Sequence, residues 1–333
     1  MNISIIGGGS WGTTLAQVLS DNGNDVLIRD INKDFVNKIN NEHLHPFFDL
    51  EIPSNIKATL DLKEALNFSD TIVLCVPTKA MRNVLHEINS LIDTKKTFVN
   101  VSKGIEPQTS YRVSEIVKDE IDNNKLEGFV VLSGPSHAEE VILRKVTSLV
   151  AASENEELAK KVQQLFSNDK YIRVYTSDDV IGVECGGSMK NAIAIISGVA
   201  SGMGLGENAR AFLITRGMKE LISITCALGG RMETAYGLSG IGDLIVTASS
   251  LNSRNFQCGL RIGKGMSVSD AEGEIVQSVE GIRAIQAGYE IGKKYNIDLP
   301  LINTAYQVVM GKLSAKEALE ELLKRSLKTE KFW

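Results

Sequence analysis

A glycine-rich turn near the start of the chain constrains its fold more than any other feature. The turn Gly7–Gly12 reads G-x-G-x-x-G, follows the apolar run Asn2–Ile6 and precedes residues typical of a helix. In such a unit Gly7 permits the tight turn, Gly9 lets a pyrophosphate approach the backbone, and Gly12 lets the helix pack closely on the strand. The pattern predicts a dinucleotide-binding turn, and the alternative is a glycine turn with a purely structural role.

A second apolar run supports the binding interpretation. The predicted strand Asp25–Arg29 ends at Asp30. This acid follows Gly7 by about the 20 residues expected of a residue that binds an adenosine ribose. A carboxylate at this place binds a ribose diol and repels the 2′-phosphate of NADP, so NAD(H) is favoured. Arg29 and Lys33 oppose that repulsion with positive charge, so NADP(H) remains an alternative.

Strand-like and helix-like segments alternate through the first half of the chain. Strands are predicted at 2–6, 25–29, 71–76, 97–101, 129–132, 147–152 and 171–175, and helices at 33–41, 79–91 and 156–166. Apolar strands that alternate with helices are typical of a parallel sheet covered on both faces. Further on, only helices are predicted, at 183–200, 209–228, 279–294 and 315–323. We therefore expect an α/β protein, with a Rossmann-type, doubly wound, mostly parallel sheet in domain 1–179 and an all-α domain in 180–333.

Composition and charge argue against several classes of protein. The formal net charge is −5, from 36 basic and 41 acidic residues, and no basic stripe indicates a nucleic-acid surface. No apolar run reaches the length of a membrane span, and the first predicted strand leaves no room for a signal peptide. The four cysteines lack C-x-x-C spacing and are interpreted as reduced core thiols, and the four histidines form no metal motif. We expect a cytoplasmic protein that binds neither metal nor nucleic acid.

Polar residues follow two of the predicted strands at their carboxyl ends. Lys103 follows the strand at 97–101, and Gly134 and Ser136 follow the strand at 129–132. Ligands of open α/β sheets bind outside these strand ends. Lys103 is therefore a candidate ligand-binding cation, and a solvated loop lysine is the alternative.

The helical half contains polar clusters of its own. Gly186 and Gly187 lie within a predicted helix, where each costs on the order of 1 kcal/mol relative to alanine. Such a cost indicates close approach by another backbone or by a ligand. Lys190 and Asn191 lie one turn further along that helix, and Asp243 follows a separate glycine-rich loop.

Ser253, Arg254 and Asn255 place a hydroxyl, a guanidinium and an amide in succession. The donors of Arg254 match the geometry of a phosphate, and the two neutral side chains add further donors. Taken singly, each candidate has a simpler interpretation: Lys190 as a surface lysine, Asp243 as a helix N-cap and Arg254 as a salt-bridge partner.

These motifs, in this order, resemble those of a known family. The chain resembles the soluble, bacterial-type NAD(P)-dependent glycerol-3-phosphate dehydrogenases from its first strand to its C-terminal helices. The motifs that carry the resemblance are Gly7–Gly12, 102–106, 134–136, 186–191, 208–210, 213–217, 240–244 and 253–255.

The resemblance implies roles for individual residues. It implies that Lys190 exchanges the proton at the reacting oxygen, that Lys103 is a second lysine at the substrate, and that Asp243 pairs with this basic group. The substrate-binding residues that it implies are these three together with Gly134, Ser136, Asn191, Ser253, Arg254 at the phosphate, and Asn255. The implied cofactor-binding residues are Gly7, Gly9, Ser10, Trp11, Gly12, Asp30, Lys103, Ala138, Arg254, Ser278 and Glu280.

The reaction that the resemblance implies is reversible hydride transfer between NAD(P)H and dihydroxyacetone phosphate. The product would be sn-glycerol 3-phosphate for glycerophospholipid synthesis, and the resemblance also implies a homodimer. The chain departs from the family pattern at His137 and Ser278, positions that bear on cofactor fit. Two alternatives stay open: another β-hydroxyacid or phosphogluconate-type dehydrogenase with the same two-domain plan, and a nicotinamide-binding sensor without catalytic activity.

Overall fold

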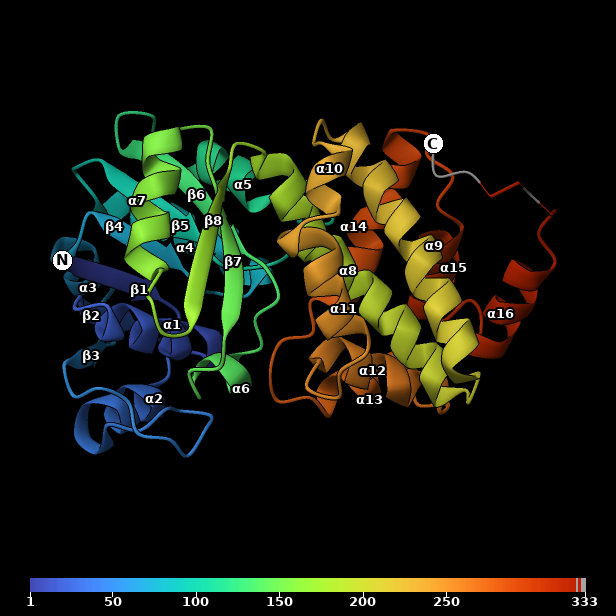
Figure 1. Ribbon diagram of the computed structural model, residues 1–333, viewed down its shortest axis with the longest axis horizontal. Helices are drawn as coiled ribbons and strands as arrows, with labels where there is room; N and C mark the ends of the chain where they lie inside the picture. The colour runs from blue at the N-terminus through green and yellow to red at the C-terminus, as the bar shows by residue number, and fades with distance from the viewer. Residues whose placement is uncertain (328, 331–333) are drawn as a thin grey trace. The chain divides into compact units, whose positions relative to one another are not determined.

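The computed structural model describes residues 1–327, 329 and 330 and divides into two compact units. The first comprises Met1–Lys103 and Arg112–Val180, and the second comprises Gly104–Tyr111 and the chain from Ile181 onward. The first is built around a β-sheet and the second from helices (Figure 1). The predicted fold class is confirmed. Segment Gly104–Tyr111, which falls inside the predicted domain 1–179, lies in the second unit.

One eight-stranded sheet forms the centre of the first unit. Its strands are β1 (Asn2–Ile6), β2 (Asp25–Arg29), β3 (Ile56–Thr59), β4 (Thr71–Leu74), β5 (Lys96–Asn100), β6 (Leu126–Ser133), β7 (Thr147–Ala152) and β8 (Ile172–Ser177). They lie in the order β3-β2-β1-β4-β5-β6-β7-β8, and every neighbouring pair is parallel except β6 with β7. The strand order reverses between β1 and β4, so ligands are expected in the crevice at the carboxyl ends of these two strands.

Helices lie on both faces of this sheet (Figure 1). They are α1 (Ser10–Asp21), α2 (Lys33–Asn37) continued by the π-helical turn η1 (Lys38–Glu42), α3 (Leu62–Phe68), α4 (Thr78–Leu91), α5 (Val113–Glu120), α6 (Ala138–Val141) and α7 (Glu156–Phe166). Every residue of β4 and β5 is buried, because both faces of these central strands are covered. Double coverage explains why β4 can be recognised in the sequence as a short apolar run.

Four elements of the first unit, β3, α3, α5 and α6, are missing from the sequence prediction. β3 is an edge strand in which only Ile56 and Ala58 are buried, so it presents no continuous apolar run. α3 is seven residues long, which is too short for a clear helical period. It begins where the side chain of Asp61 accepts hydrogen bonds from two backbone N–H groups of the first turn.

Helices make up nearly all of the second unit. They are α8 (Val180–Gly202), α9 (Gly206–Ala227), α10 (Met232–Ala235), the π-helical turn η2 (Leu238–Gly242), α11 (Asp243–Ala248), α12 (Arg254–Gly263), α13 (Val268–Gly273), α14 (Gly281–Lys294), α15 (Pro300–Val309) and α16 (Ala315–Leu323). The four predicted helices correspond to α8, α9, α14 and α16. The others have four to ten residues, too few turns for a hydrophobic period to stand out.

Glycines bring α8 and α12 into backbone contact. A Cβ atom at Gly198 would lie 2.2 Å from the carbonyl oxygen of Phe256, and one at Gly259 would lie 2.1 Å from that of Ile195. Neither side chain can be added without moving a helix, because the interior is close-packed. The contact therefore fixes the N-terminus of α12 against the helix that carries Lys190.

The four cysteines are reduced thiols with different exposures. Cys185 and Cys258 are buried and Cys75 is half-buried, but Cys226 is exposed, so the prediction of a core thiol is wrong for that residue. Cys226 lies in the last turn of α9, where the face of the helix rather than the residue type decides burial. Within the described residues, no helix has the length and apolar character needed to cross a membrane, and no three histidine, cysteine or acidic side chains gather as metal ligands would.

Candidate active site

The glycine turn has the geometry that its sequence predicts. Gly7 has a φ of 111°, and a Cβ atom there would lie 2.4 Å from the carbonyl oxygen of Cys75. A Cβ atom at Gly12 would lie 1.9 Å from the carbonyl oxygen of Gly7, so α1 can approach β1 only because this residue is glycine. At Gly9 a Cβ atom would meet nothing within 4 Å. The backbone beside the N-terminus of α1 is therefore open to an anion.

Asp30 is fixed beside this turn. Its Oδ2 accepts a hydrogen bond from Gly8 N at 2.6 Å, and its Oδ1 accepts one from Asn32 N at 2.8 Å. Both donors are backbone groups, so the carboxylate is positioned by the end of β2 and by the glycine turn together. The arrangement places a negative charge against Gly8, one residue before the open backbone at Gly9.

A buried histidine that the sequence did not single out holds the start of α1. The Nε2 of His45 lies 3.0 Å from the carbonyl oxygen of Ser10, and its Nδ1 accepts hydrogen bonds from Phe47 N and Phe48 N, each at 3.1 Å. Burial lowers the pKa of His45 to about 4, against the bond to Ser10, which raises it. The ring is therefore neutral at pH 7 and carries its proton on Nε2. A lone histidine in a polar loop gives no sequence signal of this role.

Ser10 and Trp11 form the first turn of α1. Ser10 is buried, while Trp11 is half-buried against the core of the first unit. Both are therefore at the helix end where a pyrophosphate is expected.

The structure brings together Lys103, Gly134 and Ser136 at the ends of β5 and β6. Lys103 Nζ donates to the carbonyl oxygen of Gly134 at 2.9 Å, and Ser136 Oγ donates to the same oxygen at 2.9 Å. Gly134 has a φ of 143°, and a Cβ atom there would lie 3.0 Å from the carbonyl oxygen of Ser148. Ala138 follows as the buried first residue of α6.

A buried ion pair forms the centre of the second group of candidates. Lys190 Nζ lies 2.5 Å from Asp243 Oδ1 and donates to Thr247 Oγ1 at 2.7 Å. The side chains of Lys190 and Asp243 are 8% and 1% exposed. Thr247 donates in turn to the backbone oxygen of Asp243 at 2.6 Å. Thr247 is not among the predicted site residues, although its position four residues after Asp243 puts both on one helix face.

The predicted close approach at the glycine pair of α8 is present. A Cβ atom at Gly186 would lie 2.5 Å from the carbonyl oxygen of Ser239, which belongs to η2. This contact lies one turn before Lys190 and just before Asp243 in the chain. Glycine at this place therefore lets the two segments that carry the ion pair lie against each other.

An asparagine bridge joins three helices in the second unit. Asn255 Nδ2 donates to Asn191 Oδ1 at 2.9 Å, and Asn255 Oδ1 accepts from Gly281 N at 2.9 Å. Ser253 is the N-cap of α12, since its Oγ accepts a hydrogen bond from the backbone at 3.2 Å. Arg254 is exposed at the first position of that helix.

The remaining candidates, Ser278 and Glu280, are half-buried and directly precede α14. The predicted site residues thus form two groups, one in each unit. The first unit contains Gly7, Gly9, Ser10, Trp11, Gly12, Asp30, Lys103, Gly134, Ser136 and Ala138, and the second contains Lys190, Asn191, Asp243, Ser253, Arg254, Asn255, Ser278 and Glu280.

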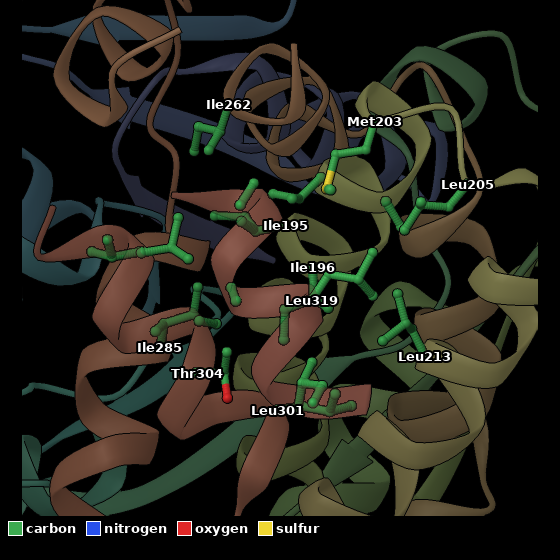
Figure 2. A pocket seen from close by; sticks show the side chains of 18 residues that line it. Ile195, Ile196, Met203, Leu205, Leu213, Ile262, Ile285, Leu301, Thr304 and Leu319 are labelled. Atoms are coloured by element: carbon green, nitrogen blue, oxygen red, sulfur yellow. The ribbon is translucent and has the colours of Figure 1, made fainter. Parts of the chain in front are cut away.

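A separate apolar cavity of about 70 Å³ lies within the second unit (Figure 2). Aliphatic side chains line it, among them Ile195, Leu213 and Leu301, and Thr304 contributes a hydroxyl group. None of the predicted site residues lines this cavity. It is therefore no part of the candidate active site.

Comparison with known proteins decides among the three functions that the sequence leaves open. Residues 2–159 match the model of the N-terminal part of NAD-dependent glycerol-3-phosphate dehydrogenases, and residues 179–320 match that of the C-terminal part. The chain belongs to this family. The resemblance inferred from the motifs is thereby confirmed, and this glycerol-3-phosphate dehydrogenase is an oxidoreductase.

Full-length relatives carry the same name. The glycerol-3-phosphate dehydrogenase [NAD(P)+] of Acholeplasma laidlawii is 59% identical over 330 residues, covering 99% of each chain. That of Staphylococcus haemolyticus is 46% identical, covering 98% of this chain and 99% of its own. The crystal structure of the Coxiella burnetii enzyme superposes with a TM-score of 0.91 at 35% identity, covering 97% of this chain and 99% of its own. A D-mandelate dehydrogenase at 15% identity and a TM-score of 0.64 shares the fold alone.

Proposed function

We propose that this glycerol-3-phosphate dehydrogenase interconverts dihydroxyacetone phosphate and sn-glycerol 3-phosphate with Lys190 as its acid–base group. The reaction follows from the family and from the names of its full-length relatives. The observation that supports the role of Lys190 is its buried contact with Asp243 and Thr247. A lysine ammonium held in this way has a fixed position and a weakly hydrated charge, which suits a catalytic acid.

The first unit fits a nicotinamide dinucleotide. The open backbone at Gly9, the N-terminus of α1 and the carboxylate of Asp30 match a pyrophosphate followed by a ribose diol. When bound, the cofactor supplies or accepts the hydride. We propose that Gly7, Gly9, Ser10, Trp11 and Gly12 bind the pyrophosphate, that Asp30 favours NAD(H), and that Lys103, Ala138, Arg254, Ser278 and Glu280 are further cofactor contacts.

Lys190 would act on the substrate oxygen. During reduction, negative charge grows on the ketone oxygen, and an ammonium beside it both stabilises that charge and donates the proton. In the reverse direction the same nitrogen accepts the proton. Asp243 Oδ1 and Thr247 Oγ1 hold Nζ from two sides, so the side chain does not have to be ordered when substrate arrives.

The substrate phosphate would bind at the start of α12. Ser253, Arg254 and Asn255 stand at the N-terminus of a ten-residue helix, where backbone N–H groups and the helix dipole favour anions. The guanidinium of Arg254 adds a paired set of donors. Binding a phosphate remote from the reacting carbon orients the substrate, so losing this contact should lower kcat as well as raise KM.

The other substrate contacts come from both halves of the sequence. We propose that Lys103 is a second lysine at the substrate, with Gly134 and Ser136 beside it and Asn191 supporting Asn255. We further propose that domain 1–179 serves mainly to bind cofactor and domain 180–333 to bind substrate.

Four further properties are proposed on grounds other than the geometry of the site. Cysteine thiols that form no disulfide suit a reducing compartment, which supports a cytoplasmic location. The net charge of −5 gives no reason to expect a nucleic-acid partner. The family resemblance supports a homodimer and a role in supplying glycerophospholipid synthesis. A sedimentation or light-scattering mass of one chain would contradict the dimer.

The activity can be tested by the absorbance of the reduced cofactor. Addition of dihydroxyacetone phosphate should start oxidation of NADH, whereas dihydroxyacetone, which lacks the phosphate, should start almost none. A 2-ketoacid without phosphate serves as the substrate of the alternative dehydrogenase class. Faster turnover of that ketoacid, or no turnover of any substrate with NADH bound, would overturn the proposal.

A further inference from the structure

The chain leaves the first unit directly after a proposed substrate contact. Lys103 is the last residue of its segment of the first unit, and Gly104 begins the excursion Gly104–Tyr111 into the second. The side chain of Lys103 bonds back to the carbonyl oxygen of Gly134 in the first unit. Lys103 is therefore the last residue before the chain passes from the first unit into the second.

Ile105 anchors the excursion in the second unit. Its side chain is 1% exposed and belongs to the hydrophobic core of that unit. The same core includes Met189 and Leu244. These two residues directly adjoin Lys190 and Asp243 in the sequence. Ile105 is therefore packed into the same core as the segments that position the ion pair.

The excursion is closed by its own hydrogen bonds. Glu106 N donates to the carbonyl oxygen of Tyr111 at 2.9 Å, and Ser110 N donates to that of Glu106 at 2.8 Å. Thr109 Oγ1 also donates to Glu106 Oε2 at 2.5 Å. These bonds make the segment a compact loop rather than a slack linker.

Little chain separates the anchor from the lysine. Gly104 alone lies between Lys103 and Ile105, and two residues of extended chain span at most about 7 Å. The backbone of Lys103 therefore cannot move far from the point where Ile105 is buried. The side chain of Lys103 is held by its hydrogen bond to the carbonyl oxygen of Gly134.

We propose that Ile105 is a positioning residue for catalysis, which holds Lys103 at the place where it contacts substrate. It contacts neither substrate nor cofactor and acts through the backbone of Lys103. The inference rests on the proposed role of Lys103 in substrate binding. The burial of Ile105 alone would not distinguish this positioning role from ordinary core packing.

The test compares Ile105→Ala with Ile291→Ala. Ile291 is 0% exposed and belongs to the same core, in α14, so both variants lose the same atoms from the same core. Ile105→Ala should lower kcat/KM for dihydroxyacetone phosphate by about 10- to 100-fold, as expected when a reacting group is misplaced by about 1 Å. Ile291→Ala should lower it by less than about threefold. The Kd for NADH should change much less than kcat/KM in Ile105→Ala, because Lys103 is only one of the proposed cofactor contacts, and it should not change in Ile291→Ala. Equal losses in both variants would overturn the proposal.

A double-mutant cycle distinguishes an effect that acts through Lys103 from a nonspecific effect of the substitution on the fold. In a Lys103→Ala background, Ile105→Ala should cause no further loss, because the residue acts through the lysine that is already absent. A full additional loss in that background would contradict the inference. Wild-type turnover by Lys103→Ala alone would instead overturn the proposed function of Lys103.

Conservative variants allow the same test if Ile105→Ala does not fold. Ile105→Val removes one methylene and should give a smaller loss of kcat/KM that again vanishes in the Lys103→Ala background. Ile291→Val is its matched control. Identical kcat/KM in these two valine variants would overturn the proposal even if Ile105→Ala does not fold.

Discussion

Lys190 Nζ lies 2.5 Å from Asp243 Oδ1, and both side chains are almost fully buried. A buried charge pair of this kind is costly to break, because removing one partner leaves the other charge without compensation. The pair therefore couples the proposed chemistry to the stability of the second unit. Loss of Asp243 should therefore lower stability as well as remove a contact that positions the proposed acid.

Asp243→Ala should lower the free energy of unfolding by about 3–5 kcal/mol, because the buried Lys190 ammonium loses the carboxylate that compensates its charge. Urea denaturation followed by circular dichroism measures this loss. Glu290→Ala, which removes an exposed acid from α14, is the control and should change the free energy of unfolding by less than about 0.5 kcal/mol. Equal stability of the two variants would show that the pair is not buried as described.

Asp30→Ala should shift cofactor preference toward NADPH. Removing the carboxylate removes its repulsion of a 2′-phosphate and its bonds to a ribose diol. The ratio of kcat/KM for NADPH to that for NADH should rise about tenfold, equivalent to about 1.4 kcal/mol. Asp25→Ala, which removes an exposed acid from the first position of β2, the strand that Asp30 follows, should leave the ratio unchanged. An unchanged ratio in Asp30→Ala would place discrimination at other residues.

Glu220 should make stability depend on pH. It is 5% exposed in α9 and accepts hydrogen bonds from Leu301 N at 2.7 Å and Ile302 N at 2.9 Å. Burial raises its pKa from 4.5 to about 7, outweighing these two bonds, which lower it. The folded state therefore holds the proton more tightly than the unfolded state. The resulting stabilisation is complete below pH 4.5 and is lost as pH rises through about 7.

The loss across that window should be on the order of 3 kcal/mol, from 1.36 kcal/mol for each pKa unit. Urea denaturation from pH 4.5 to 8 compares the wild type with Glu220→Gln, which carries no titrating group and should show a flatter curve. Glu321→Gln, an exposed position in α16, is the control. If Glu220→Gln and the control depend on pH alike, the buried carboxyl does not titrate in this range.

The parts of the fold that sequence predicts are those with a local cause. Buried strands such as β4, whose last three residues are apolar, are recognisable because both faces are covered, and the glycine turn is specified by close contacts at Gly7 and Gly12. The rule that ligands bind at strand ends also selected Lys103 and Gly134, which do bond to each other.

What sequence did not predict depends on packing between distant segments. Thr247 is a partner of Lys190 only because α11 packs against α8. Ile105 is one apolar residue without a period, so nothing local marks its place in the core of the second unit. Glu220 is charged in the sequence and buried in the structure because the N-terminus of α15 supplies its partners. The grouping of Lys190 with Asp243 was expected from family resemblance rather than from spacing.

The most direct test of the account is the turnover of Lys190→Ala with dihydroxyacetone phosphate and NADH. We predict that kcat falls by about 10²- to 10⁴-fold, the usual contribution of a positioned acid–base group. The Kd for NADH should stay within about twofold of the wild-type value, because the glycine turn and Asp30 lie in the other unit. The Kd also verifies that the variant, in which Asp243 loses its contact with the Lys190 ammonium, retains its cofactor-binding unit. Turnover close to that of the wild type would contradict the assignment of Lys190 as the catalytic acid.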